Sequence, residues 1–104
     1  MNRGDIYDVD DVPAGPRPVV IATRDVAIPV LANVTVALVT STIRGVRTEV
    51  ELGVEEGVGA GSVVNCDNLF TLPQHALGRR RGTLGVERKR LFNEALRVAL
   101  ELDE

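Results

Sequence analysis

The chain has 104 residues, 12 Lys and Arg against 15 Asp and Glu, and a formal net charge of -3. This length predicts a single domain over residues 1–104. Apolar residues make up 44% and aromatic residues 3%, which argues against disorder and predicts a core of Val, Leu, Ile and Ala. One Cys and one His exclude an internal disulfide and a His or Cys metal cluster.

Composition also narrows the compartment and the partners. No apolar run reaches the ~18 residues of a membrane span, and the first residues lack the basic and apolar stretches of a signal peptide. We therefore expect a cytoplasmic protein with no membrane partner. A mildly acidic chain argues against strong non-specific nucleic-acid binding, although six bases between residues 79 and 90 form a local positive patch.

The predicted elements begin with strands. Residues 4–9 alternate apolar and acidic side chains, and residues 19–23 form a short apolar run, which indicates two strands. The three prolines in residues 10–18 predict a loop between them. The strongest strand signal is the β-branched stretch at residues 34–42. Further along the chain, the expected elements are a strand at 47–52, a glycine-rich loop at 53–61, extended segments at 62–65 and 68–72, and one helical turn near Pro73.

The periodicity of residues 86–102 predicts a helix, with Gly85 as an acceptable N-cap. Its apolar stripe holds Leu91, Ala95, Val98 and Leu102, widened by Phe92, Leu96 and Ala99. Several strands followed by one terminal helix predict a mainly β fold, a strongly bent antiparallel sheet with helix cover.

Three segments suggest chemistry that their context does not favour. The glycine-rich run at 57–62 precedes a strand rather than a helix, so a flexible hairpin loop is favoured over a phosphate-binding loop. Cys66 is interpreted as a partly buried structural thiol, and His75 as a turn or surface residue. The arginine run at 79–81 fits a solvated sheet edge and a polyanion contact about equally.

The most informative pair is Arg17 and Thr40. Arg17 lies between two prolines where a loop enters a buried strand, and Thr40 lies at the end of the apolar strand. Composition alone favours a surface charge and a β-forming residue.

At these residues the chain resembles the MazF/PemK/Kid family of toxins of bacterial type II toxin–antitoxin systems. The matching motifs are RGDIY at 3–7, RPVV at 17–20, VALVTS at 36–41, SVVNCDN at 62–68 with Thr71, and LGVE at 84–87 before an amphipathic helix. They follow the family's order over nearly the whole chain, and their order and spacing make the combination fairly specific.

The resemblance implies an SH3-like small barrel with a C-terminal helix (a MazF/CcdB-like fold) that acts as a homodimer. It implies a sequence-selective endoribonuclease that cuts single-stranded RNA, mainly mRNA, with no metal and no cofactor. Attack by the RNA 2′-OH would leave a 2′,3′-cyclic phosphate and a 5′-OH. The expected partner is a cognate antitoxin, MazE-like or another small protein, with an extended acidic segment laid across the RNA groove.

By the same resemblance, Arg17, Thr40 and Asp67 are catalytic residues. Substrate-binding roles are expected for Ser41, Asn65, Asn68, Arg79 and Arg80. Asn65 stands where some members have Arg, and the loop at 10–15 is short for the family, so the resemblance does not define the general base, the RNA motif or the antitoxin contact. Two alternatives remain: a non-nuclease toxin of the same fold, like the CcdB-type gyrase poisons, and a catalytically decayed module that binds RNA or antitoxin.

Overall fold

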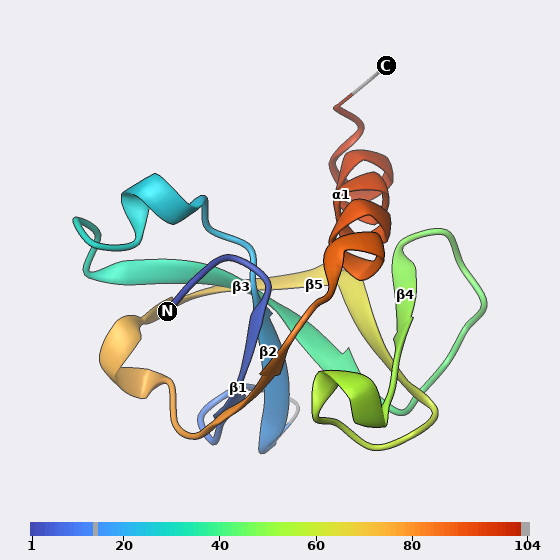
Figure 1. The fold of residues 1–104 in the computed structure, drawn as a ribbon, viewed down its shortest axis with the longest axis horizontal. Coiled ribbons are helices and arrows are strands. Elements are labelled where there is room, and N and C mark those ends of the chain that lie inside the picture. Colours follow the sequence, from blue (N-terminus) through green and yellow to red (C-terminus); the bar gives the residue numbers. More distant parts are fainter. Residues whose placement is uncertain (14, 103–104) are drawn as a thin grey trace.

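A computed structural model describes residues 1–13 and 15–102, and its strands curl around a core beside one helix (Figure 1). The strands are β1 (Asp5–Val9), β2 (Arg17–Ile21), β3 (Asn33–Thr40), β4 (Glu49–Leu52), β5 (Ser62–Pro73) and β6 (Arg80–Thr83). The helix α1 spans Val86–Leu100, and short 3-10 turns occur at Asp25–Ala27 (η1), Val54–Glu56 (η2) and Gln74–Ala76 (η3).

All strand pairs are antiparallel, and the sheet order is β4-β5-β3-β2-β1-β6. The turn η2 follows the edge strand β4 and packs on the opposite edge strand β6, so the sheet curls toward closure. This contact is very close: a Cβ on Gly57 would lie 2.0 Å from the carbonyl oxygen of Arg81. Only glycine fits there, and its φ of 84° is also one that glycine tolerates best.

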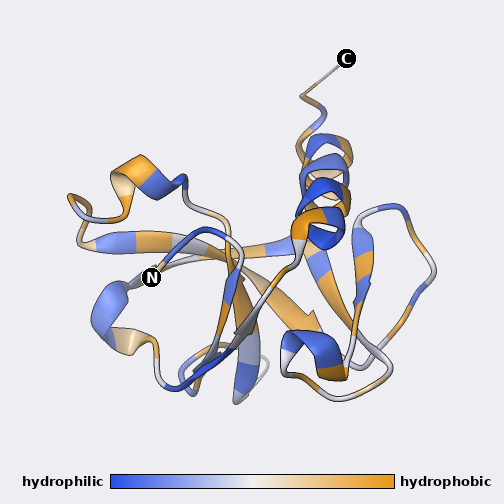
Figure 2. Cartoon of the chain, viewed as in Figure 1, coloured by the Kyte–Doolittle hydropathy of each residue, from blue (hydrophilic) through white to orange (hydrophobic). Residues whose placement is uncertain are grey.

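Both faces of the central strands are covered. Val20 belongs to the core that includes Phe92 and Ala95 of α1, whereas Val19 and Ile21 belong to a second cluster with residues of β3. A strand buried on both faces loses the simple alternation of apolar and polar residues, which explains the continuous apolar run in β2. Along α1, hydrophobic and hydrophilic residues alternate in bands (Figure 2), as expected for a helix with one buried face.

The predicted fold class is confirmed, and most predicted elements are present with shifted ends. The two extended segments at 62–65 and 68–72 are one strand, β5, interrupted by an irregularity in its pairing with β3. Strand β6 was not predicted. The helix ends at Leu100, and the predicted stripe is wrong at its far end, because Val98 is 37% exposed and Leu102 is 64% exposed. The apolar face of α1 is centred on Phe92 and Ala95 instead.

Within the described residues, no helix is both long enough and apolar enough to cross a lipid bilayer.

Candidate active site

Antiparallel pairing brings Arg17 and Thr40 together. Strand β2 begins at Arg17, and strand β3 ends at Thr40. Their register pairs Val19 with Leu38, and continuing it by two residues places Arg17 opposite Thr40. Both side chains line one hollow of about 150 Å³, whose other lining residues are Leu38, Thr42, Arg44, Asn65 and Asn68.

Arg17 carries an unused hydrogen-bond donor. Its flanking residues, Pro16 and Pro18, restrict the backbone on both sides, so the start of β2 is held in an extended conformation. The Nε atom of Arg17 is buried and has no hydrogen-bond partner within residues 1–13 and 15–102. A buried donor without an acceptor is unfavourable.

Thr40 is fixed by its own loop. Its Oγ1 accepts a hydrogen bond from the backbone N–H of Thr42 at 3.1 Å. That bond occupies a lone pair of the hydroxyl, and the hydroxyl hydrogen remains free to donate. Thr40 can therefore donate to an oxygen bound beside the Arg17 guanidinium.

Arg44, on the loop that follows β3, adds a second guanidinium to the hollow. The loop is organised by Glu49, whose Oε1 accepts backbone N–H groups from Arg44 at 3.2 Å, Gly45 at 2.9 Å and Val46 at 3.4 Å. Arg44 was not predicted to be a site residue. The Arg-Gly pair four residues after Thr40 is the signal that could have found it, since Gly45 has a φ of 72°, a conformation that favours glycine.

Of the predicted site residues on β5, two line the hollow and one does not. Asn65 and Asn68 are among its lining residues. Asn65 is buried, and its Oδ1 accepts the backbone N–H of Asp67 at 2.8 Å. The Asp67 carboxylate instead accepts a hydrogen bond from the Thr48 hydroxyl at 2.7 Å, and Asp67 is not among the residues that line the hollow.

This separation follows from an irregularity in β5. Leu38 pairs with Asn65 and Ala37 pairs with Leu69, so three residues of β5 are extra relative to β3. Extra residues in a strand change the direction of the side chains that follow. A catalytic role for Asp67 therefore stays a prediction, and it is not supported by proximity to Arg17 and Thr40.

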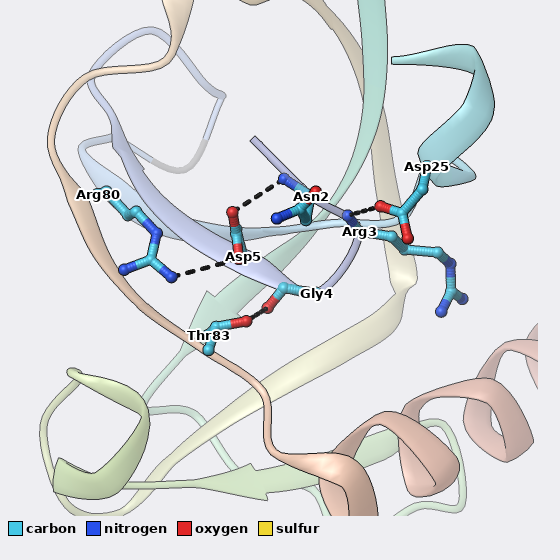
Figure 3. Close-up of polar contacts among 7 residues, drawn as sticks. All are labelled: Asn2, Arg3, Gly4, Asp5, Asp25, Arg80 and Thr83. Carbon is cyan, nitrogen blue, oxygen red and sulfur yellow. Dashed lines mark hydrogen bonds and ion pairs between the residues drawn. The ribbon is translucent and has the colours of Figure 1, made fainter. Parts of the chain in front are cut away.

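The other predicted substrate contacts lie outside the hollow. Ser41 is exposed directly after Thr40, and Arg79 is exposed at the start of the segment leading into β6. Arg80 pairs with Asp5 at 3.4 Å (Figure 3). Burial opposes ionisation of Asp5, but the hydrogen bond from the Asn2 backbone and the hydrogen bond and charge of Arg80 favour the carboxylate, and the pKa of Asp5 lies below its ordinary value. Arg80 is thus engaged in holding the N-terminal strand.

Cys66 and His75 are not part of this site. Cys66 is fully buried in the core under α1, and burial, with the nearby Asp67 charge, raises the pKa of its thiol to about 12. His75 is exposed in η3. Across the described ranges, no three His, Cys, Asp or Glu side chains are grouped so that they could hold a metal ion.

The curled antiparallel sheet and its cationic hollow define a small β protein with a site suited to a phosphate group. A protein-family model matches residues 2–100, and the chain belongs to that family, the PemK-like, MazF-like toxins of type II toxin–antitoxin systems. The family expected from the sequence motifs is therefore confirmed.

Curated relatives and solved structures agree with this assignment. The chain is 46% identical over 87 residues to endoribonuclease MazF3 of Mycobacterium tuberculosis, with 84% of each chain covered. It is 38% identical over 100 residues to the probable endoribonuclease MazF2 of the same organism, covering 95% of this chain and 97% of that protein.

Among structures, the Mycobacterium tuberculosis toxin MazF-mt6 is similar with a TM-score of 0.88 and 41% identity, over 96% of this chain and 99% of that one. An endoribonuclease in complex with its cognate antitoxin from a mycobacterial species gives a TM-score of 0.90 at 29% identity, over 100% of this chain and 98% of that one.

Proposed function

We propose that this chain is a toxin that cleaves single-stranded RNA in a sequence-selective way, without a metal, and that a cognate antitoxin neutralises it. The observation that carries the proposal is the convergence of Arg17 and Thr40 on one hollow. Two relatives are named endoribonuclease MazF3 and probable endoribonuclease MazF2, and these names support the same activity. The gyrase-poison alternative would not require these two residues to meet.

The chemistry uses a nucleophile that RNA itself provides. The 2′-oxygen attacks the adjacent phosphorus, so the O2′–P bond forms, the P–O5′ bond breaks, and the products are a 2′,3′-cyclic phosphate and a 5′-OH. The 2′-OH loses its proton, and the leaving 5′-oxygen gains one. The protein must align this attack and stabilise the charge that develops on the phosphoryl oxygens.

Arg17 and Thr40 supply that stabilisation. A guanidinium offers paired donors in a plane, which match the oxygens of a phosphodiester, and Arg17 lines the hollow. The Thr40 hydroxyl donates to the same group from the neighbouring strand. Arg44 adds positive charge, and within the described residues no carboxylate lines the hollow to oppose it.

We also propose, from family membership, that the working form is a homodimer and that the antitoxin covers the RNA-binding surface. The structural neighbour solved with its cognate antitoxin supports an antitoxin partner. Sedimentation of the purified chain would measure the oligomeric state, and a monomer at micromolar concentration would contradict the dimer.

The experiment treats a single-stranded RNA transcript with purified protein in EDTA and maps the fragment ends. Wild type should leave 5′-OH and 2′,3′-cyclic phosphate ends. Arg17→Ala should slow cleavage by roughly 100-fold or more, the loss typical of one preorganised donor. Arg24→Ala is the matched control, because Arg24 is an exposed arginine beyond the far end of β2. Wild-type cleavage by Arg17→Ala, or gyrase-dependent DNA breaks without RNA loss, would contradict the proposal.

A further inference from the structure

A second depression adjoins the hollow and shares Arg17 with it. We call it the furrow. It measures about 320 Å³ and is lined by Asp8, Val9, Asp10, Pro16, Arg17, Pro18 and Arg81. An RNA strand whose cleaved phosphate lies beside Arg17 and Thr40 would place a neighbouring nucleotide in this furrow.

The charges of the two depressions differ. The charged residues of the hollow are Arg17 and Arg44, which give it a formal charge of +2. The furrow holds two arginines, Arg17 and Arg81, and two carboxylates, Asp8 and Asp10, so its formal charge is 2 − 2 = 0. A positive hollow favours a phosphate. A neutral furrow that presents both donors and acceptors matches the edge of a nucleobase, which presents both as well.

Arg81 is held in place in the furrow. Gly82 pairs with Ile6 and Arg80 pairs with Tyr7, so Arg81 is the extra residue of a bulge in β6, and bulges commonly redirect a side chain near a site. Its Nε donates to the carbonyl of Gly57 at 3.1 Å. Its Nη1 donates to Asp8 at 3.0 Å.

The Arg81 contacts leave donors for a ligand. Together they use two of the five N–H donors of a guanidinium. Among the described residues the remaining three have no partner, and the side chain is 30% exposed. A base entering the furrow can therefore accept from Arg81 without breaking either contact.

Asp8 is equally well positioned. Its backbone N–H donates to the carbonyl of Arg79 at 2.8 Å, and its carbonyl accepts the N–H of Gly78 at 2.7 Å. The ion pair with Arg81 uses Oδ1, which leaves Oδ2 to accept from an exocyclic amine or ring N–H. Asp8 and Arg81 thus present an acceptor and several donors side by side, on a rigid backbone.

We propose that the furrow binds the nucleobase next to the cleaved phosphate, and that Asp8 and Arg81 read the edge of that base. The inference rests on the proposed function and adds to it the residues that set the sequence preference at one position. An Arg that reads a base discriminates against other bases, whereas an Arg that binds a phosphate strengthens binding to all sequences alike.

The test maps cut sites in a random single-stranded RNA pool for wild type, Asp8→Asn and Arg81→Gln. Asp11→Asn is the matched control, because Asp11 is an exposed carboxylate just after β1 that does not line the furrow. Asp8→Asn replaces an acceptor by a group that also donates. It should change the base preference at one position beside the cut by about fivefold or more, and leave other positions as in wild type.

Two results would overturn the inference. One is that both variants retain the wild-type preference at every position. The other is that Arg81→Gln weakens cleavage of all sequences equally and also makes RNA binding less dependent on salt. The slope of the logarithm of the RNA-binding constant against the logarithm of the salt concentration would then become shallower by about 0.7, which would make Arg81 a phosphate contact. Both variants should fold with a modest loss of stability, because the Asp8 and Arg81 side chains are partly exposed, at 37% and 30%, and a partly exposed ion pair contributes little; thermal unfolding checks this.

A binding measurement separates this inference from the proposed function. The probes are 2′-O-methyl oligonucleotides of A, C or U, which keep the bases and phosphates but cannot provide the 2′-OH nucleophile. Asp8→Asn should change the ratio of affinities among the three by about fivefold, and Asp11→Asn should not. A changed affinity ratio together with no RNA cleavage by wild type would contradict the proposed nuclease activity and support base binding in the furrow. An unchanged ratio together with normal cleavage would support the nuclease activity and contradict base binding in the furrow.

Discussion

Because Arg17 has an unpaired buried donor, we predict that this residue lowers the free energy of unfolding of the protein. The Nε atom of Arg17 is buried without a hydrogen-bond partner in the described part of the chain, and a buried unsatisfied donor costs about 1–3 kcal/mol. Replacing Arg17 by Met keeps an unbranched stem and removes the donor. It also removes a positive charge beside Arg44 in the hollow. Arg17→Met should therefore raise the free energy of unfolding by about 1 kcal/mol or more, while cleavage is lost.

The assay is urea unfolding at fixed protomer concentration, because a dimer's stability depends on that concentration. For a domain of this size, about 1 kcal/mol corresponds to a rise in Tm of roughly 4–8 °C. Arg81→Met is the matched control: its guanidinium does have partners, Asp8 and the carbonyl of Gly57, so the same substitution there should destabilise. The reasoning is refuted when Arg17→Met unfolds at lower urea than wild type.

Three further predictions test other parts of the structure. The pKa of Asp5 is lowered in the folded state, so the ionised carboxylate adds to the free energy of unfolding above its unfolded pKa, and this contribution is lost as pH falls through the folded pKa. The difference in free energy of unfolding between wild type and Asp5→Asn, about 1 kcal/mol, should therefore shrink below about pH 4. A constant difference down to pH 2 would show that Asp5 does not gain stability from ionisation. Glu49→Ala should accelerate hydrogen exchange of the three loop amides that the carboxylate accepts and slow cleavage through Arg44, whereas Glu49→Gln keeps an acceptor; unchanged exchange in Glu49→Ala would remove the positioning role. Because burial raises the pKa of Cys66 to about 12, a thiol reagent at pH 8 should react with it only as fast as the protein unfolds, and rapid labelling of the native protein would contradict this burial.

Local patterns in the sequence predicted the elements that form from local forces. The β-branched run of β3 and the 3.6-residue period of α1 indicate their structures without reference to any partner. Strand β6 does not follow from such a pattern, because its sequence of arginines and glycine lacks apolar alternation. It forms because β1 supplies a pairing edge and η2 packs against it.

The residues of the candidate site likewise fall into those that the sequence could predict and those that it could not. The family motifs identified Arg17 and Thr40, and the antiparallel register then explains why residues 23 positions apart meet. The contribution of Arg81 and the position of Asp67 depend on irregular pairing in β6 and β5. A shift of one residue in a strand moves a side chain to the other face, and no local signal in the sequence locates such a shift.

The most direct test of the central claim is a double-mutant cycle on the rate of RNA cleavage under single-turnover conditions. If Arg17 and Thr40 act together on the same phosphodiester, the free-energy costs of the two substitutions are not additive. Removing either residue already removes most of what the pair contributes to the rate. We predict that Arg17→Ala/Thr40→Ala cleaves about as slowly as the slower single variant. A double variant whose loss equals the product of the two single losses would contradict a shared site.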